Sequence, residues 1–364
     1  MWLKRTDLER DNHRASLAYL FAEPNRTEEV LRFGVALHRF FGSRGHLDAI
    51  AHVRAALERQ DPVSAALRVR ALCVTSDLVA YTLGVEDRAE MSSAIELCEQ
   101  ALEMARELDD PALLAEALGT LSVWVDSEED SSRKISLAEE ALEVGRSTGD
   151  PWLIGRAFQG LGGTAPTPDD EQALALEGLA YFRQAGDIYY AIPQLWCLAR
   201  LETNKGELAA ARILYEDAIA AAEDIGSPID LNYSWNSLCF VLLLLEKFEE
   251  AALVSCKSLV GGRRLGHRRV VAFAIFVLAC CAAGLGEHRR AAQLTGSHDA
   301  IEADIIGVGG AYSLTPLEQR VWEDNTARLR EFLGKGEFVR AYGIGRGLTF
   351  DQAVDLALGR VHAI

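Results

Sequence analysis

The chain has 364 residues, 49% of them hydrophobic and 25% charged, so it can bury a large core and is not an intrinsically disordered protein. Its formal net charge of -17 opposes a polyanion, which argues against direct nucleic-acid binding by this chain. The seven cysteines form no CxxC pair and no zinc pattern with histidine, so we expect free thiols, no metal site and a reducing, cytoplasmic location.

Signals for helix N-termini recur along the chain from residue 61 onward. The first 14 residues lack the apolar core of a signal peptide, so secretion is not expected. A capping residue then stands directly before proline at Asp61-Pro62, Asp110-Pro111, Asp150-Pro151 and Ser227-Pro228. Proline suits the first helical position because its missing N–H would have no partner there. Each pair therefore predicts the start of a new helical hairpin.

Five segments that follow such starts share one pattern of large and small residues. They cover residues 112–125, 152–163, 189–200, 231–242 and 270–281. Their equivalent leucines follow one another at 40, 37, 40 and 40 residues and are Leu121, Leu161, Leu198, Leu238 and Leu278. A large residue stands three positions before each leucine and a small residue directly after it, which lets one helix face pack closely on a neighbouring helix. We predict that these segments are the first helices of the hairpins.

The second helices of the hairpins follow after short turns. They are predicted at 45–61, 89–110, 131–150, 169–187, 206–226, 246–266 and 286–305. A repeat of this length indicates an array of supersecondary units that bury their apolar faces against one another. The expected fold is all-α, an α-α superhelix of about seven hairpins with a period of about 40 residues.

One apolar run, from Val270 to Gly286, also suits a short membrane-spanning helix. It lies in register with the other first helices and contains glycine in its last turn, so we interpret it as a buried repeat helix. No membrane association is expected. A basic cluster precedes and opens this run, at Arg263, Arg264, His267, Arg268 and Arg269. We interpret these charges as complements to helix ends at a turn rather than as a nucleic-acid patch.

The C-terminal segment has its own helix signals. Thr315 and Glu318 have the spacing of a capping box, and so do Thr349 and Gln352. The expected organisation is a repeat array over residues 1–305 and a C-terminal helical cap over residues 306–364, packed on the last repeat. Such a cap would cover the apolar face that a repeat array exposes at its end.

The large-x-x-large-small pattern, with a turn glycine and an alanine five residues later, resembles tetratricopeptide repeats, although those repeats are about 34 residues long. Residues 8–21 and the segment from RRAAQLTGSHDAIEADIIG to the C-terminal helices resemble the helical-repeat region of actinobacterial STAND-type signalling ATPases and LuxR-type transcriptional regulators. The resemblance implies a right-handed solenoid and a role in bacterial signal transduction or transcription regulation. Members of that family normally carry a nucleotide-binding module, but this chain has no GxxxxGK[ST] motif.

The resemblance also implies a binding surface, because the first helices of tetratricopeptide superhelices line a concave face. Glu116 would project there, together with the residues that we expect to bind a ligand or partner: Arg156, Gln159, Trp196, Arg200, Tyr233, Asn236, Phe240, Phe273 and Phe276. Aromatic rings combined with amides and arginines suit a peptide segment, a partner protein or a small effector. The alternative is that closure of the superhelix or the C-terminal cap buries Phe240, Phe273 and Phe276 as core.

The sequence contains no GxSxG or HExxH motif and no other recognisable catalytic pattern, so we expect neither enzyme activity nor a cofactor. The function predicted from the sequence is a protein-interaction or effector-sensing module of a bacterial regulator. The alternative is an architectural scaffold or self-association module, in which the chain forms a homo-oligomer without a ligand.

Overall fold

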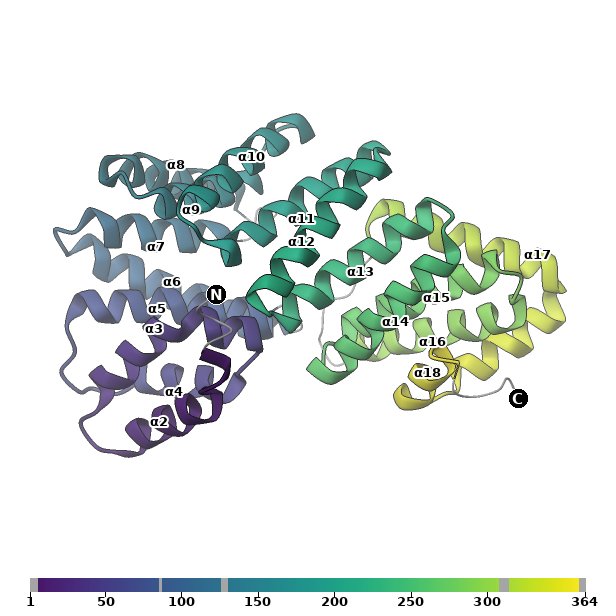
Figure 1. The fold of residues 1–364 in the computed structure, drawn as a ribbon, viewed down its shortest axis with the longest axis horizontal. Coiled ribbons are helices and arrows are strands. Elements are labelled where there is room, and N and C mark those ends of the chain that lie inside the picture. Colours follow the sequence, from purple (N-terminus) through teal and green to yellow (C-terminus); the bar gives the residue numbers. More distant parts are fainter. Residues whose placement is uncertain (1–5, 85–86, 126–129, 308–313, 360–364) are drawn as a thin grey trace. The chain divides into compact units, whose positions relative to one another are not determined.

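The computed structural model describes residues 6–84, 87–125, 130–307 and 314–359, and within these ranges the chain is helical without a β-strand (Figure 1). Most of the described helices pack against the next helix along the chain. The fold is therefore an all-α array of tetratricopeptide-like hairpins, as the sequence predicts. None of the described helices is both long enough and apolar enough to cross a membrane.

The chain divides into two compact units, the first made of residues 1–198 and 220–227 and the second of residues 199–219 and 228–364. The first unit contains α2 Arg10–Ala22, α3 Thr27–Arg44, α4 Leu47–Leu57, α5 Ala65–Val79, the π-helical turn η1 Ala80–Gly84, α6 Arg88–Arg106, α7 Pro111–Trp124, α8 Ser131–Thr148, α9 Pro151–Gly162 and α10 Pro168–Gln184. The second contains α13 Pro228–Leu244, α14 Phe248–Leu265, α15 Arg268–Gly284, α16 His288–Gly307, α17 Pro316–Arg346 and α18 Phe350–Ala357. Residues of α11 Ile188–Lys205 and α12 Leu208–Ile225 belong to both units.

The first helices of the hairpins form a continuous layer within each unit. In the first unit α3 packs on α5, α5 on α7 and α7 on α9, and in the second unit α13 packs on α15. The leucines that define the repeat are buried at Leu121, Leu198, Leu238 and Leu278, whereas Leu161 is half-buried. The register derived from the sequence therefore corresponds to the packed face of these helices.

Three of the four predicted proline starts are confirmed. Asp110 accepts hydrogen bonds from two backbone N–H groups at the start of α7, Asp150 caps α9, and α13 begins at Pro228. The prediction for Asp61-Pro62 is wrong, because α5 begins at Ala65 with Ser64 as its N-cap. The carboxylate of Asp61 instead accepts a hydrogen bond from the hydroxyl of Thr27. Asp61 therefore joins the start of α3 to the segment between α4 and α5.

The basic cluster around α14 and α15 forms ion pairs within the second unit. Arg263 lies 2.9 Å from the Asp351 carboxylate of α18, and Arg268 pairs with Asp304 of α16. The apolar run that begins at Val270 is the buried helix α15. Both features therefore contribute to packing between helices.

The C-terminal helices begin as predicted and cover the last hairpin. Thr315 and Thr349 form the two capping boxes that open α17 and α18. Helix α17 packs on α15 and α16, and α18 packs on the same pair. Trp322 of α17 contacts the ring of Phe276, with 5.2 Å between the ring centroids. The assignment of residues 306–364 to a separate capping domain stays a prediction.

Glycine makes the closest approach between α16 and α17 possible. A Cβ atom at Gly345 would lie 1.7 Å from the carbonyl oxygen of Gln293, so a larger residue cannot fit without separating the two helices. Ser297 also donates a hydrogen bond to the Gly345 carbonyl over 3.1 Å. The close contact between α16 and α17 therefore depends on a bare backbone at this position.

We predict that Gly345→Ala destabilises the second unit by about 1–3 kcal/mol, because overpacking forces the helices apart. Gly343→Ala, on the same helix, is the matched control. A Cβ atom there meets nothing within 4 Å, and alanine is the better helix former by about 1 kcal/mol, so this variant should be neutral or stabilising. Urea denaturation of both variants measures the difference, and equal free energies of unfolding would contradict the close contact.

Candidate functional site

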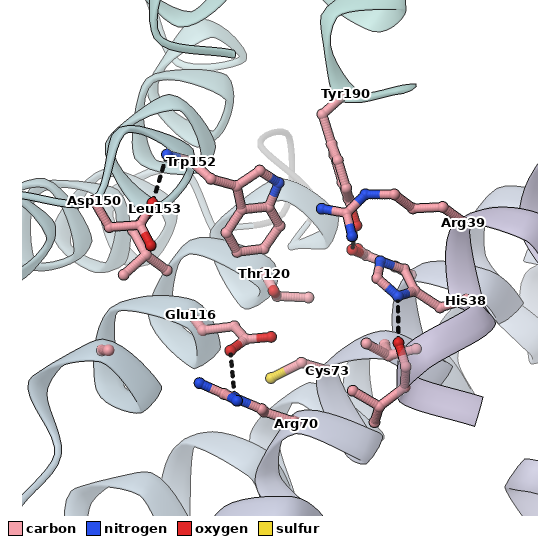
Figure 2. A pocket seen from close by; sticks show the side chains of 14 residues that line it. His38, Arg39, Arg70, Cys73, Glu116, Thr120, Asp150, Trp152, Leu153 and Tyr190 are labelled. Carbon is pink, nitrogen blue, oxygen red and sulfur yellow. Dashed lines mark hydrogen bonds and ion pairs between the residues drawn. The ribbon is translucent and has the colours of Figure 1, made fainter. Parts of the chain in front are cut away.

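The first unit contains a cavity of about 350 Å3 between the first helices of its hairpins (Figure 2). Side chains from α3, α5, α7, the start of α9 and Tyr190 of α11 form its walls. The lining residues are Val35, His38, Arg39, Arg70, Cys73, Val74, Asp77, Ala112, Glu116, Thr120, Asp150, Trp152, Leu153 and Tyr190. Residues that are far apart in the sequence thus meet around one space because successive first helices lie side by side.

A buried carboxylate, that of Asp77, holds the wall of this cavity together. Its Oδ1 atom accepts hydrogen bonds from Arg156 Nη2 at 2.8 Å and from Trp124 Nε1 at 2.7 Å. Its Oδ2 atom accepts a hydrogen bond from the Tyr190 hydroxyl at 2.9 Å. Burial raises the pKa of Tyr190 well above its ordinary value, which keeps this hydroxyl protonated as a donor. The carboxylate is therefore satisfied by three side chains from three other helices.

Arg156 and Gln159, two residues predicted to face a ligand, do not line the cavity, but Arg156 contacts its lining residue Asp77. The Arg156 side chain is only 1% exposed, and its second polar contact is a 3.0 Å hydrogen bond to Gln159 Oε1. Its guanidinium also lies 5.2 Å from the ring centroid of Tyr190. Arg156 thus forms a buried ion pair with Asp77, and loss of one partner from such a pair costs about 3–5 kcal/mol.

A second ion pair joins α3 to the start of α11. The Nε atom of Arg39 lies 2.9 Å from Asp187 Oδ2, and the guanidinium is 5.5 Å from the ring centroid of Tyr190. The charges of Arg39 and Asp187 therefore balance each other beside the cavity, as those of Arg156 and Asp77 do.

Glu116 of α7 is paired more weakly than Asp77, and the third lining carboxylate, Asp150, is exposed and caps α9. Its side chain is 15% exposed, and its contact with a cation is 3.6 Å to the Nε atom of Arg70, whose side chain is 53% exposed. The pKa of Glu116 is raised to about 7, mainly by burial and also by the charge of Asp77, against the opposing charges of Arg70 and Arg156. Both protonation states of Glu116 are therefore populated at neutral pH.

His38 of α3 presents a neutral ring to the cavity. Its Nδ1 atom lies 2.8 Å from the Val35 carbonyl oxygen, which assigns the proton to Nδ1 and leaves a lone pair on Nε2. Burial lowers the pKa of His38 to about 4, so the ring stays uncharged in the neutral range. His38 is therefore a buried acceptor at Nε2.

Three lining side chains have a buried polar atom without a hydrogen-bond partner among the described residues: His38 Nε2, Thr120 Oγ1 and Trp152 Nε1. A buried donor or acceptor left in this way costs about 1–3 kcal/mol. Figure 2 shows the Thr120 hydroxyl and the Glu116 carboxyl beneath the Trp152 indole, with His38 on another side. Three side chains that line the cavity therefore carry one donor, one acceptor and one hydroxyl group whose hydrogen bonds are not supplied by the described residues.

The other predicted binding residues lie elsewhere on the helices. Trp196 is half-buried in α11 and Arg200 is exposed, while Tyr233 and Asn236 are half-buried in α13. Asn236 Oδ1 accepts a hydrogen bond from Ser258 at 3.1 Å. A ligand-binding role for these four residues stays a prediction.

The three predicted phenylalanines form an aromatic cluster in the second unit. Phe240 and Phe276 are buried, Phe273 is half-buried, and the Phe273 and Phe276 ring centroids are 5.3 Å apart. The full burial of Phe276 against Trp322 agrees with the alternative that the C-terminal helices cover this cluster as core. A ligand-binding role for these three residues stays a prediction.

The second unit has a larger cavity, of about 480 Å3, between the ends of α13 and α15 and the face of α17. The rings of His288 and Phe332 meet across it with their centroids 3.6 Å apart. His298, Asp299 and Glu302 of α16 also place their ligand-type atoms within 4.8 Å of one another, but Asp299 already accepts a hydrogen bond from Tyr342 at 2.7 Å. His288 and Asp299 thus connect α16 to α17, and we take the first-unit cavity as the stronger candidate site.

Sequence reasoning did not select His38, Arg39, Asp77, Trp152 or Tyr190 as site residues. One signal was available, because Asp77 is an acidic residue within the apolar run of α5 and buried charges need partners. The identity of those partners was not available, since they lie 47, 79 and 113 residues further along the chain.

Neither a family model nor a curated protein matches this chain. Among solved structures, the chain is similar to a Signal Transduction ATPase with Numerous Domains, a STAND protein with a tetratricopeptide repeat sensor, from Pyrococcus horikoshii. The TM-score is 0.54 and the sequence identity is 14%, over 93% of this chain and 55% of that protein. This likeness shows the tetratricopeptide-like fold, and the chain spans about half the length of its structural relative.

The raised pKa of Glu116 predicts a pH-dependent stability. Its folded-state pKa of about 7 exceeds the ordinary value of 4.5, so the folded state binds more protons between these values. Its stabilising contribution is present below pH 4.5 and is lost as the pH rises through 7, with an upper limit of about 3 kcal/mol. Glutamine does not titrate, so the Glu116→Gln variant should not lose this stability as the pH rises. We predict that the free energy of unfolding of Glu116→Gln, minus that of wild type, increases from pH 5 to pH 8.

Urea denaturation at each pH measures this difference, since the other carboxylates titrate equally in both proteins. Glu103→Gln, on the exposed face of α6, is the control and should show no such trend. A constant difference between Glu116→Gln and wild type over the whole pH range would contradict the raised pKa.

Proposed function

We propose that this chain is an effector-sensing helical-repeat module of a bacterial signalling or transcription regulator, and that a small polar molecule binds in the first-unit cavity. The observation that supports this proposal best is the set of buried polar atoms without protein partners at His38, Thr120 and Trp152. A ligand that forms hydrogen bonds to them would recover the cost of their desolvation. The volume lies at the small end of the range for ligand pockets, about 300–1,000 Å3.

The placement of the cavity supports a sensing role. His38, Thr120 and Trp152 come from α3, α7 and α9, which are first helices of separate hairpins. A molecule that contacts all three would favour the arrangement of hairpins in which these contacts are formed together. The similar solved structure is described as a STAND protein with a tetratricopeptide repeat sensor. We propose a comparable sensing role for this chain.

The chemistry of the lining favours binding over catalysis. Burial raises the pKa of Cys73 well above its ordinary value, so its sulfur stays a thiol and is a poor nucleophile. Asp77, Arg156, Arg39 and Asp187 are held in ion pairs with one another. These groups determine the shape of the cavity and leave no activated nucleophile with a neighbouring base.

We predict that Ala112→Phe, which adds a ring to the cavity lining, removes the response of the chain to its effector. A screen of small polar metabolites by thermal shift and calorimetry should find a compound that raises the melting temperature of wild type, because binding to the folded state stabilises it by mass action. At a concentration 100 times Kd this stabilisation is about 2.7 kcal/mol. The Ala112→Phe variant should melt independently of that compound.

Ala173→Phe, on the exposed face of α10 in the same unit, is the matched control and should respond like wild type. Circular dichroism of both variants shows whether the helices are retained. A response that survives Ala112→Phe would exclude the cavity as the site. No response of wild type to any compound would favour an architectural role.

A further inference from the structure

We infer that the ligand of the first-unit cavity is a small organic cation, with an ammonium or guanidinium group that pairs with Glu116 and a hydrogen-bond acceptor that faces Trp152. This inference rests on the proposed function, because it specifies the class of molecule that the same cavity binds. Two observations support this inference. Glu116 has no close buried cation, and His38, Thr120 and Trp152 each have a polar atom without a hydrogen-bond partner among the described residues.

The charge balance around the cavity leaves one buried carboxylate without a close buried cation. Arg156 neutralises Asp77 at 2.8 Å, and Arg39 neutralises Asp187. Glu116 has only the 3.6 Å contact with Arg70, and exposure of that guanidinium weakens the pair through solvent screening. A cationic ligand would supply the missing charge at close range, whereas an anionic ligand would be repelled by Glu116.

The available acceptors fit the N–H groups of such a cation. His38 Nε2 has a lone pair and no partner, and its ring is uncharged, so it can accept an N–H, although the nearby charge of Arg39 opposes a cation at this position. Thr120 Oγ1 has no partner and can accept a second N–H. Glu116, Thr120 and His38 therefore offer three acceptors to an ammonium or guanidinium group, which are donor-only groups.

The available donor defines the rest of the ligand. The indole Nε1–H of Trp152 is buried without a partner, and an indole nitrogen can only donate. The molecule should therefore carry an acceptor, such as a hydroxyl or carbonyl oxygen, in addition to its cationic group. The volume of about 350 Å3 limits it to a small molecule.

Cation binding should be coupled to a proton. Glu116 faces Arg70, Cys73 and Asp77 of α5, Arg156 of α9, and His38 and Arg39 of α3. The arginines remain charged, and burial keeps the Cys73 thiol protonated and the His38 ring neutral near pH 7. A cation that requires the carboxylate form of Glu116 therefore displaces its proton, whereas an anion that favours the acid form would increase proton uptake.

The test uses the full chain and sets of three matched compounds, each containing an amine, its alcohol isostere and its carboxylic acid analogue. One such set is tyramine, tyrosol and 4-hydroxyphenylacetic acid, and further sets replace the ring by short chains and the amine by a guanidine. At least one amine or guanidine should bind, with its alcohol and acid analogues at least about tenfold weaker, as loss of a charge-assisted hydrogen bond requires. Calorimetry measures each Kd.

Calorimetry in two buffers with different ionisation enthalpies then measures proton exchange. Binding of the cation near pH 7 should release a fraction of a proton, because burial leaves Glu116 partly protonated there. Glu116→Gln should weaken cation binding at least about tenfold and abolish the proton release. Glu103→Gln should leave both unchanged.

The possible outcomes separate this inference from the proposed function. If alcohols or acids bind, amines do not, and Ala112→Phe abolishes that binding, the cation class is wrong while the cavity remains an effector site. If an amine binds but Ala112→Phe and Glu116→Gln have no effect, both the site and its ligand class are wrong. Absence of binding by every amine and guanidine also overturns the inference.

Discussion

The arrangement of the first unit depends on the burial of one carboxylate, that of Asp77. Its oxygens accept hydrogen bonds from Trp124 of α7, Arg156 of α9 and Tyr190 of α11. A buried charge is tolerated only when its partners are in place, so these three contacts fix the positions of four first helices relative to one another. Apolar packing alone is non-directional and would allow the helices to slide. The polar cluster therefore determines the register at which the apolar faces meet.

This constraint also explains why a cavity persists in a packed helical array. The side chains of Arg156 and Tyr190 are held by hydrogen bonds to Asp77, so they cannot turn to fill the space beside Glu116 and Trp152. Helix packing elsewhere in the unit is close, as at Gly160, where a Cβ atom would lie 2.1 Å from Ser122 Oγ. The cavity is thus a local consequence of fixed hydrogen bonds rather than of generally loose packing.

The sequence predicts the helices of this fold well because their signals are local. Leucine spacing, the caps at Asp110 and Asp150 and the capping boxes at Thr315 and Thr349 act over a few residues, and each is found in the structure. The site was only partly predictable. The repeat pattern selected Arg156 as a ligand-binding residue, but burial in an ion pair and projection into a ligand site give the same pattern in one sequence. Only the fold distinguishes these possibilities, because the partner of Arg156 lies 79 residues away.

The contrast between two carboxylates indicates how structural and functional roles are divided in the cavity. Asp77 has three close donors and can gain little from a further partner, so its contribution is to stability. Glu116, on the neighbouring helix, has one distant and exposed cation, and burial raises its pKa to about 7. The charged form of a buried carboxylate without a close cation is unfavourable. A positively charged ligand would therefore stabilise Glu116 more than it would stabilise Asp77. The residues around Glu116 belong to successive hairpins, and each hairpin in a repeat array is stabilised by its neighbours. A ligand that stabilises the charged form of Glu116 therefore also acts on the interfaces between these hairpins.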